Sequence, residues 1–149
     1  MSERQRIVIT VGLPGSGKST WLARLGANAI SSDAIRQLLA DDVTDQKIHT
    51  RVFATIRYLL RQRIAIGRPV SYVDATHLTV EERLPYIDIG RSYGCDVEAV
   101  FFDVSLEICR ERNRMRDRVV PDDAMEMMAA KLAVPSKEEG FRRVSVIAY

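Results

Sequence analysis

The sequence predicts an α/β fold in which a parallel five-stranded sheet carries helices on both faces. Short apolar and β-branched segments alternate along the whole chain with longer helical segments, and the first is residues 7–11. Alternation of this kind is typical of parallel sheets, since every return to the sheet needs a crossover connection. The chain has 149 residues, a common size for one domain, so we expect a single domain over residues 1–149.

The order of the elements follows from turn and capping residues. Strands are expected at residues 7–11, 29–31, 70–74, 97–104 and 144–147. Helices are expected at residues 21–25, 34–40, 46–66, from 80, after 105 as far as 116, and 121–133. Pro85 leaves two alternatives, a helix that begins two or three residues after Val80 or one that bends at the proline. The expected strand order is 2-3-1-4-5.

The segment Val11–Thr20 reads V-G-L-P-G-S-G-K-S-T and contains G-x-x-x-x-G-K-[ST], the P-loop or Walker A pattern, between a strand and a helix. Its glycines let the backbone turn N–H groups toward a phosphate, and the following helix start adds more. Lys18 can reach the β- and γ-phosphates, and Ser19 offers a hydroxyl to Mg²⁺. An ordinary glycine-rich turn is a poor alternative. We expect a nucleoside triphosphate site formed by Gly12, Gly15, Ser16, Gly17, Lys18, Ser19 and Thr20.

Three carboxylates follow predicted strands, where ligands of parallel sheets bind. Asp33 precedes a helix that carries Arg36 three residues later, so both can face one phosphate acceptor. Asp33 could be the base that a kinase needs near the acceptor hydroxyl, or Ser31 or Asp33 could merely cap the helix. Asp74 and Asp103 each end an apolar strand, as a magnesium-binding Walker B carboxylate does, and their spacing does not choose between them.

Five arginines fall between Arg110 and Arg118. On a helix, Arg112 and Arg116 lie one turn apart on one face, which could clamp phosphates because guanidinium groups match phosphate oxygens bidentately. The alternative is a solvated charged face.

The composition limits the remaining possibilities. The formal net charge is +2, so no overall field requires a polyanionic partner. The two cysteines lack metal or redox spacing and are expected to be reduced thiols of a cytoplasmic protein. No segment has the length or composition of a signal peptide or membrane span. His49 is expected at the surface or partly packed, while His77 lies near the predicted ligand crevice.

An ordered set of segments resembles the kinase module of bacterial polynucleotide kinase-phosphatases and the kinase half of the phage polynucleotide 5′-kinase. The resemblance covers essentially the whole chain, and the ordered set is more specific than the P-loop alone. The segments are Gly12–Thr20, Ile30–Asp33 with Arg36, Asp41–Asp42 with Asp45–Gln46, Val73–His77, Arg112–Asn113 with Arg116, and Glu139–Arg142.

The resemblance implies an enzyme that moves the γ-phosphate of ATP, with Mg²⁺, to a 5′-hydroxyl end of RNA or DNA. By the same resemblance Asp33 is the general base, and Arg36 holds the terminal phosphodiester of the acceptor. It places Arg112 and Arg116 in a lid, about residues 110–121, that contacts ATP phosphates, with Lys18 and Arg116 taking part in catalysis. It also favours Asp74 over Asp103, and it adds Thr76 to the substrate-binding residues.

Two departures from the family pattern are visible. His77 stands where that family commonly has asparagine, and no phosphatase or ligase domain follows Tyr149. The second departure suggests either a stand-alone kinase or an excised module. Competing functions are a P-loop kinase of a small molecule, such as a sugar, nucleoside or antibiotic, and a regulatory ATPase. The candidate base Asp33 argues against the regulatory function, and the lack of a strong basic stripe weakens the nucleic-acid function.

Overall fold

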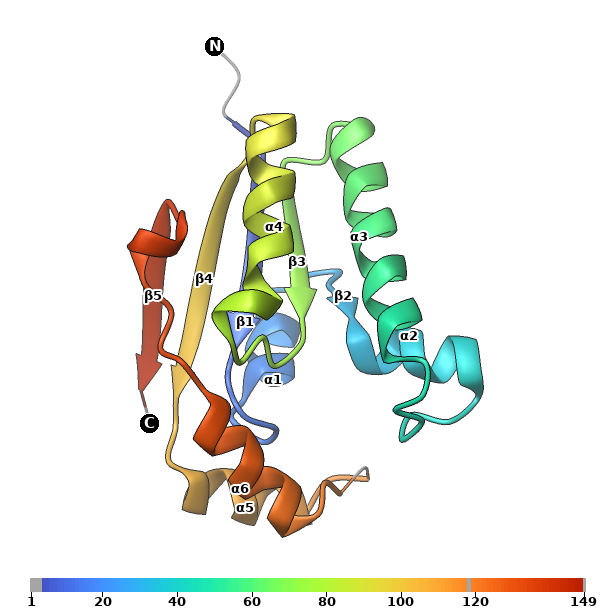
Figure 1. The fold of residues 1–149 in the computed structure, drawn as a ribbon, viewed down its shortest axis with the longest axis vertical. Helices are drawn as coiled ribbons and strands as arrows, with labels where there is room; N and C mark the ends of the chain where they lie inside the picture. Colours follow the sequence, from blue (N-terminus) through green and yellow to red (C-terminus); the bar gives the residue numbers. More distant parts are fainter. Residues whose placement is uncertain (1–3, 118, 149) are drawn as a thin grey trace.

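The computed structural model describes residues 4–117 and 119–148. Its five-stranded parallel sheet has the order β2-β3-β1-β4-β5, which confirms the predicted fold class and strand order (Figure 1). The strands are β1 (Arg6–Val11), β2 (Ile30–Ser31), β3 (Val70–Asp74), β4 (Asp96–Asp103) and β5 (Arg143–Ala148). The helices are α1 (Lys18–Arg24), α2 (Ser32–Ala40), α3 (His49–Ala65), α4 (Val80–Tyr93), α5 (Leu106–Arg114), α6 (Asp122–Lys131) and the 3₁₀ helix η1 (Lys137–Glu139).

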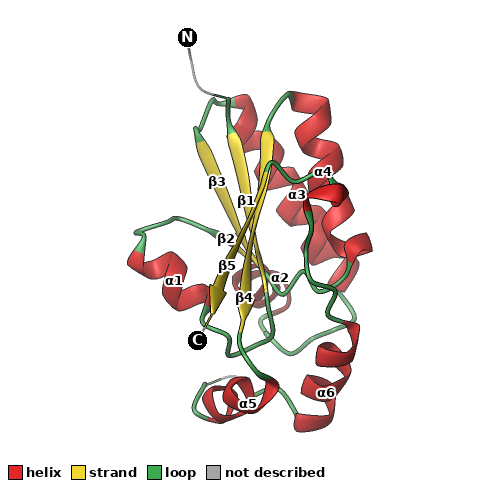
Figure 2. Cartoon of the chain, turned by 90° about the vertical axis from the view of Figure 1, so that its left-hand side faces the viewer, coloured by secondary structure: helices red, strands yellow, loops and turns green. Residues whose placement is uncertain are grey.

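The sheet separates two hydrophobic cores, because successive side chains of a strand point to opposite faces. Alternate β1 residues, beginning with Ile7, pack toward α3 and α4 in the larger core. Val8 faces the other side, which α1 covers (Figure 2). On that side Trp21 of α1 meets Tyr72 and Phe102 edge-on, with ring centroids 6.3 and 5.8 Å apart. Both faces of β1 are therefore buried, which explains its run of apolar and β-branched residues.

Helices α5 and α6 lie together beyond the carboxyl ends of β1 and β4 (Figures 1 and 2). A third apolar cluster joins them to the P-loop and to the loop after β3, and its buried members are Leu13, Leu78, Cys109, Val120 and Met125. This cluster places α5 directly against the phosphate-binding loop.

Several predicted helix boundaries were wrong. Helix α4 begins at Val80 and contains Pro85, so a later start is excluded. It can start there because Thr79 accepts a hydrogen bond of 3.2 Å from the backbone N–H of Glu82. The predicted helix from residue 46 begins instead at His49, and α6 begins one residue later than expected, with Pro121 as its N-cap.

The largest difference concerns α5, which ends at Arg114 rather than continuing to Arg116. Arg116 follows the helix, so the prediction that Arg112 and Arg116 share a helical face is wrong. Arg118, also part of the arginine cluster, lies outside the described residues, as do residues 1–3 and Tyr149. Among the described residues, no helix is both long enough and apolar enough to cross a membrane.

Candidate active site

The P-loop connects β1 to α1 in the conformation that its glycines predict. Gly15 and Gly17 have φ values of 84° and 102°, in the left-handed region that favours glycine. A Cβ atom on Gly15 would lie 2.6 Å from the carbonyl oxygen of Cys109 in α5. Gly15 is therefore required both by its backbone conformation and by the close approach of α5.

Gly12 has a different role from the other P-loop glycines. Its backbone N–H donates a hydrogen bond of 3.0 Å to the carbonyl oxygen of Thr76, which holds the P-loop to the loop after β3. A Cβ atom on Gly12 would meet Ser16 Oγ at 2.7 Å and Phe102 Cβ at 3.1 Å. Gly12 thus supports the base of the P-loop, and residues 14–20 line the cleft above it.

Lys18 is buried at the first position of α1, with its side chain folded over the P-loop. Its Nζ donates hydrogen bonds of 2.9 Å to the carbonyl oxygen of Gly12 and 2.7 Å to that of Leu13. Burial lowers the pKa of Lys18 to about 8, with Asp74 opposing this shift and Arg116 adding to it. The ammonium group lies in a poorly solvated position, where an anionic phosphate would stabilise its charge.

Ser19 and Asp74 meet at the junction of the P-loop and β3. The hydroxyl of Ser19 donates a hydrogen bond of 2.7 Å to Asp74 Oδ2. The geometry distinguishes the two candidate carboxylates, because Asp74 lines the cleft beside the P-loop, whereas Asp103 is exposed at the end of β4 and does not line the cleft. Mg²⁺ prefers oxygen ligands of this kind, so the pair fits a magnesium ion that also binds phosphate oxygens.

A single cleft of about 780 Å³ joins these residues to the predicted acceptor residues. The P-loop and Asp74 form one part of it. Residues from α2 and the start of α3 form another part, and the α5–α6 segment covers it from the remaining side. Of the predicted site residues, the cleft is lined by Gly15, Ser16, Gly17, Lys18, Ser19, Thr20, Asp33, Arg36, Asp74, Thr76, Arg112 and Arg116.

Asp33 lies in the first turn of α2 and does not act as its cap. The cap is Ser31, whose Oγ accepts a hydrogen bond of 3.2 Å from the N–H of Ala34. The carboxylate of Asp33 instead faces the cleft, with Oδ2 3.9 Å from Arg116 Nη2. The capping function is therefore satisfied by Ser31, and Asp33 lines the cleft.

The arginines at the end of α5 differ in position. Arg112 Nη1 donates a long hydrogen bond of 3.5 Å to the carbonyl oxygen of Gly15, so it lies over the P-loop. Arg116 lies farther along, across the cleft and close to Asp33. Arg114 is exposed and lies 3.4 Å from Asp122 in α6. Two arginines thus converge on the cleft although only one of them is helical.

The α3 side of the cleft contains two residues that the sequence did not single out as site residues. His49 and Phe53 both line the cleft, with ring centroids 4.7 Å apart and ring planes inclined by 40°. His49 is exposed, as the sequence predicted, but it also contacts Arg36 through its Nδ1 atom at 3.4 Å. Because His49 and Phe53 are one helical turn apart, the sequence could have indicated that they share a face of α3. It did not show that this face points toward α2, and the helix was expected to begin at residue 46.

His77 is fully buried and does not line the cleft. Its Nδ1–H donates a hydrogen bond of 2.6 Å to the carbonyl oxygen of Thr10, so the neutral Nε2 accepts one of 2.9 Å from the hydroxyl of Tyr86. Burial lowers the pKa of His77 to about 4, and the charges of Lys18 and Arg83 add to the shift while the bond to Thr10 opposes it. His77 is therefore a neutral structural residue that fixes the loop after Asp74.

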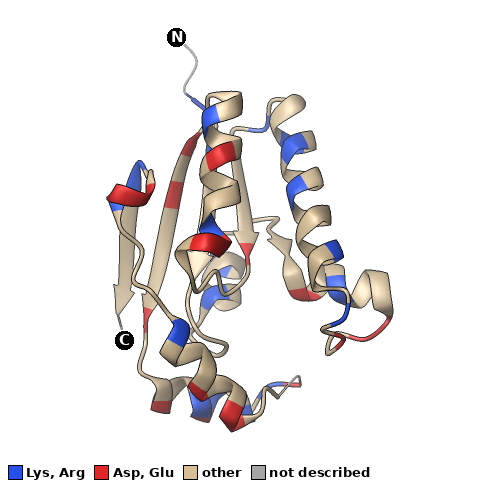
Figure 3. Cartoon of the chain, in the orientation of Figure 1, with Lys and Arg blue, Asp and Glu red and all other residues tan. Residues whose placement is uncertain are grey.

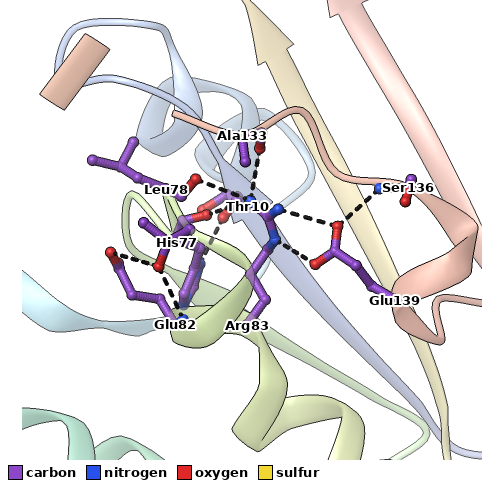
Figure 4. Close-up of polar contacts among 9 residues, drawn as sticks. Thr10, His77, Leu78, Glu82, Arg83, Ala133, Ser136 and Glu139 are labelled. Carbon is purple, nitrogen blue, oxygen red and sulfur yellow. Dashed lines mark hydrogen bonds and ion pairs between the residues drawn. The ribbon is translucent and has the colours of Figure 1, made fainter. Parts of the chain in front are cut away.

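A buried arginine anchors the same loop to the end of the α6 segment (Figure 4). Arg83 Nη1 donates hydrogen bonds of 3.0, 3.2 and 3.0 Å to the carbonyl oxygens of His77, Leu78 and Ala133. Its Nε and Nη2 atoms bind both carboxylate oxygens of Glu139 at 2.8 and 3.1 Å. The Glu139 segment noted in the sequence thus has a structural function, because it pairs the buried guanidinium that holds two loops together.

The comparisons with known proteins agree with this arrangement. A family model described as an AAA domain matches residues 7–135, from β1 to the segment after α6. The chain belongs to this AAA domain family. Its P-loop and parallel sheet are typical of such a nucleotide-binding P-loop domain.

One curated relative is the bifunctional polynucleotide phosphatase/kinase of Schizosaccharomyces pombe. It is 26% identical over 157 residues, which cover 99% of this AAA domain chain and 35% of the relative. The chain therefore spans about a third of the length of that relative. This match confirms the resemblance to polynucleotide kinases that the ordered sequence segments indicated.

Two solved structures have a similar fold. One is a chain in the Pnkp1/Rnl/Hen1 RNA repair complex, with a TM-score of 0.74 and 21% identity, covering 89% of this chain and 45% of that one. The other is a gluconokinase from Sinorhizobium meliloti 1021, with a TM-score of 0.62 and 20% identity, covering 99% of this chain and 84% of that one. The fold is thus similar to that of a chain of an RNA repair complex and to that of a gluconokinase.

Proposed function

We propose that the protein is a kinase that transfers the γ-phosphate of ATP to the 5′-hydroxyl end of RNA or DNA. The observation that carries the proposal is the shared cleft, in which the phosphate-binding P-loop faces the Asp33 carboxylate and the Arg36 guanidinium. A phosphoryl transfer enzyme needs both a phosphate-binding loop and residues that bind and activate the acceptor. A regulatory ATPase has no need of an acceptor-side base. The polynucleotide phosphatase/kinase relative, aligned over 99% of the chain, supports a polynucleotide as the acceptor.

On the donor side, backbone N–H groups of residues 15–19 and the Lys18 ammonium bind the β- and γ-phosphates. Ser19 and Asp74 would hold Mg²⁺, which would neutralise negative charge on the triphosphate when bound. Arg112, over Gly15, and Arg116 contact the transferring phosphate and stabilise the charge that spreads over its oxygens. The two arginines belong to a lid of about residues 110–121.

On the acceptor side, Arg36 binds the phosphodiester next to the terminal nucleoside, and Thr76 lines the floor between the two substrates. Asp33 accepts the proton of the 5′-hydroxyl group while the oxygen of that hydroxyl group attacks the γ-phosphorus atom. The bond from that phosphorus to the β-bridging oxygen breaks, and ADP leaves. The products are the 5′-phosphorylated strand, ADP and a proton first held by Asp33.

A second candidate function is the phosphorylation of a small polar molecule. The observation in its favour is the similarity to the gluconokinase, whose chain is covered over 84% of its length. In addition, Lys and Arg are interspersed with Asp and Glu on α4, α5 and α6, although α3 carries Arg without Asp or Glu (Figure 3), and the net charge is only +2. Such a surface predicts that few phosphates are bound, which suits a strand end but also suits a small molecule.

The test is a transfer assay with labelled ATP and Mg²⁺. The acceptors are RNA and DNA oligonucleotides with a 5′-hydroxyl, the same oligonucleotides with a 5′-phosphate, gluconate and a nucleoside, with Lys18→Ala protein as the control for contaminating kinases. We expect label only on the 5′-hydroxyl oligonucleotides. Label on gluconate or the nucleoside, with none on any oligonucleotide, would establish the second function instead.

A further inference from the structure

The acceptor half of the cleft is built around Arg36, whose side chain is held from two directions. The residue is only 4% exposed. Its Nε donates a hydrogen bond of 3.0 Å to the carbonyl oxygen of Asp45 in the loop between α2 and α3. That carbonyl is itself fixed, because Asp45 Oδ1 accepts a hydrogen bond of 2.9 Å from the N–H of Lys47 and closes a tight turn.

The second contact is with His49, at the first position of α3. Arg36 Nη2 lies 3.4 Å from His49 Nδ1. A guanidinium group can only donate hydrogen bonds, so Nδ1 must be the accepting nitrogen and the proton of the neutral imidazole must be on Nε2. The ring of Phe53, one turn along the helix, also contacts the imidazole, with ring centroids 4.7 Å apart.

We propose that His49 is a positioning residue of the acceptor site, which acts through Arg36. Its neutral imidazole holds the guanidinium in the orientation that binds the acceptor, and Phe53 holds the imidazole. The physical benefit is preorganisation, because an arginine side chain that is already ordered loses less conformational entropy when the acceptor binds. The inference rests on the proposed function, in which Arg36 binds the phosphodiester of the acceptor.

Two substitutions separate the hydrogen bond from the ring contact. His49→Asn retains an accepting oxygen near the position of Nδ1 but removes the aromatic ring. His49→Phe retains a ring against Phe53 but removes the acceptor. We expect His49→Phe to raise the KM for a 5′-hydroxyl oligonucleotide about five- to tenfold, in the range of one lost intramolecular hydrogen bond of ordinary strength. The kcat and the KM for ATP should stay near those of the wild type.

His49→Asn should restore the acceptor KM to within about twofold of the wild type, since the amide oxygen replaces the lost acceptor. Thr50→Ala, an exposed neighbour in α3 that does not line the cleft, is the matched control and should change neither KM. The opposite ranking, with His49→Phe normal and His49→Asn impaired, would overturn the inference and indicate that the ring alone contacts the acceptor.

A double-mutant cycle shows whether His49 acts through Arg36. In an Arg36→Ala background, His49→Phe should cause no further increase in the acceptor KM. Independent, multiplicative increases would overturn the inference. Thermal midpoints measured on the same proteins should stay close to that of the wild type for the His49 variants, because His49 is exposed.

Nitrogen NMR gives a readout that does not depend on the reaction. We expect His49 in the wild-type protein, at mildly alkaline pH, to have an unprotonated Nδ1 and a protonated Nε2. A protonated Nδ1 would overturn the inference even if the enzyme phosphorylates oligonucleotides. Conversely, a wild-type protein that labels no 5′-hydroxyl oligonucleotide would overturn the proposed function, and the ring tautomer would then decide the contact with Arg36 by itself.

Discussion

The Ser19 hydroxyl donates a hydrogen bond of 2.7 Å to Asp74 Oδ2, which joins the first turn of α1 to the end of β3. The two residues are 55 positions apart in the sequence, and they meet because β1 and β3 are parallel neighbours. Their oxygen atoms lie at the mouth of the P-loop, where magnesium-bound phosphates are expected. Asp103, at the end of the other neighbour of β1, makes no such contact in the described structure.

Asp74→Asn should therefore raise the Mg²⁺ concentration that gives half-maximal rate. We expect a loss of roughly 10–100-fold in metal affinity or in activity, as is typical for a carboxylate that orients a metal site. The measurement is the initial rate against Mg²⁺ concentration. Asp103→Asn is the matched control, since it removes an exposed strand-end carboxylate outside the cleft, and equal effects of the two changes would contradict the assignment.

Lys18→Ala should reduce phosphoryl transfer to background without unfolding the protein. The amine is removed from the position that faces the phosphates, while its hydrogen-bond acceptors Gly12 and Leu13 remain in the P-loop backbone. The rate is measured at saturating ATP and Mg²⁺, with a thermal melt of the same sample. Near-normal turnover from the purified variant would show that the P-loop assignment is wrong.

Much of this site could be predicted from the sequence because it depends on local pattern and on the geometry of parallel sheets. Lys18 and Ser19 belong to a contiguous motif, and Asp33 and Asp74 follow short apolar strands. Residues at the carboxyl ends of parallel strands lie at one edge of the sheet, whatever the intervening sequence. The local sequence motifs and the general topology of parallel sheets were therefore sufficient to predict that these four residues lie in one cleft.

The features that were not predicted depend on contacts between distant residues. His77 is buried because Thr10 and Tyr86 provide partners for both ring nitrogens, and no local pattern reveals those partners. The proximity of His49 to Arg36 depends on how the loop at Asp45 folds back onto α2. The prediction that α5 continues to Arg116 was wrong, because the helix ends at Arg114, where the chain turns toward α6.

The convergence of Arg112 and Arg116 on the cleft predicts which arginines of the cluster are sensitive to substitution. Arg112→Lys and Arg116→Lys keep the charge but lose the planar group that binds two phosphate oxygens. Removing one donor to developing charge typically costs ~10²–10³-fold in kcat, so a change that keeps the charge should cost about tenfold or more. Arg114→Lys is the control, because Arg114 is exposed and pairs with Asp122. Equal losses at all three positions in kcat assays would argue against this geometry.

Asp33→Asn tests the proposed general base. Because Ser31 caps α2, replacing the Asp33 carboxylate should leave the thermal midpoint nearly unchanged. The amide cannot accept the proton, so kcat should fall by ~10²–10⁴-fold, the usual contribution of a general base. Arg36→Ala should instead raise the acceptor KM more than it lowers kcat, if the guanidinium binds ground and transition states equally. An unchanged kcat in Asp33→Asn would remove Asp33 from the catalytic residues.

His77 predicts a loss of stability in mild acid that is independent of catalysis. The pKa of its buried imidazole is lowered from 6.5 to about 4, so the unfolded chain takes up a proton at a higher pH than the folded protein. The contribution of His77 is fully present above the unfolded pKa of 6.5, and it is lost as the pH falls toward 4. The loss amounts to about 3 kcal/mol when each pKa unit is converted at 1.36 kcal/mol.

His77→Asn provides the comparison for this prediction. Asparagine tolerates the left-handed backbone at this position, where φ is 45°, and its side-chain amide can donate to the carbonyl oxygen of Thr10, but it does not titrate. The free energy of unfolding of both proteins is measured by urea denaturation from neutral pH down to pH 4. The wild type should lose more stability than the variant over this interval, and the difference should develop below pH 6.5, the unfolded pKa of the imidazole. Parallel curves would show that other groups, such as the carboxylates, cause all of the acid sensitivity and that His77 is not held neutral by its burial.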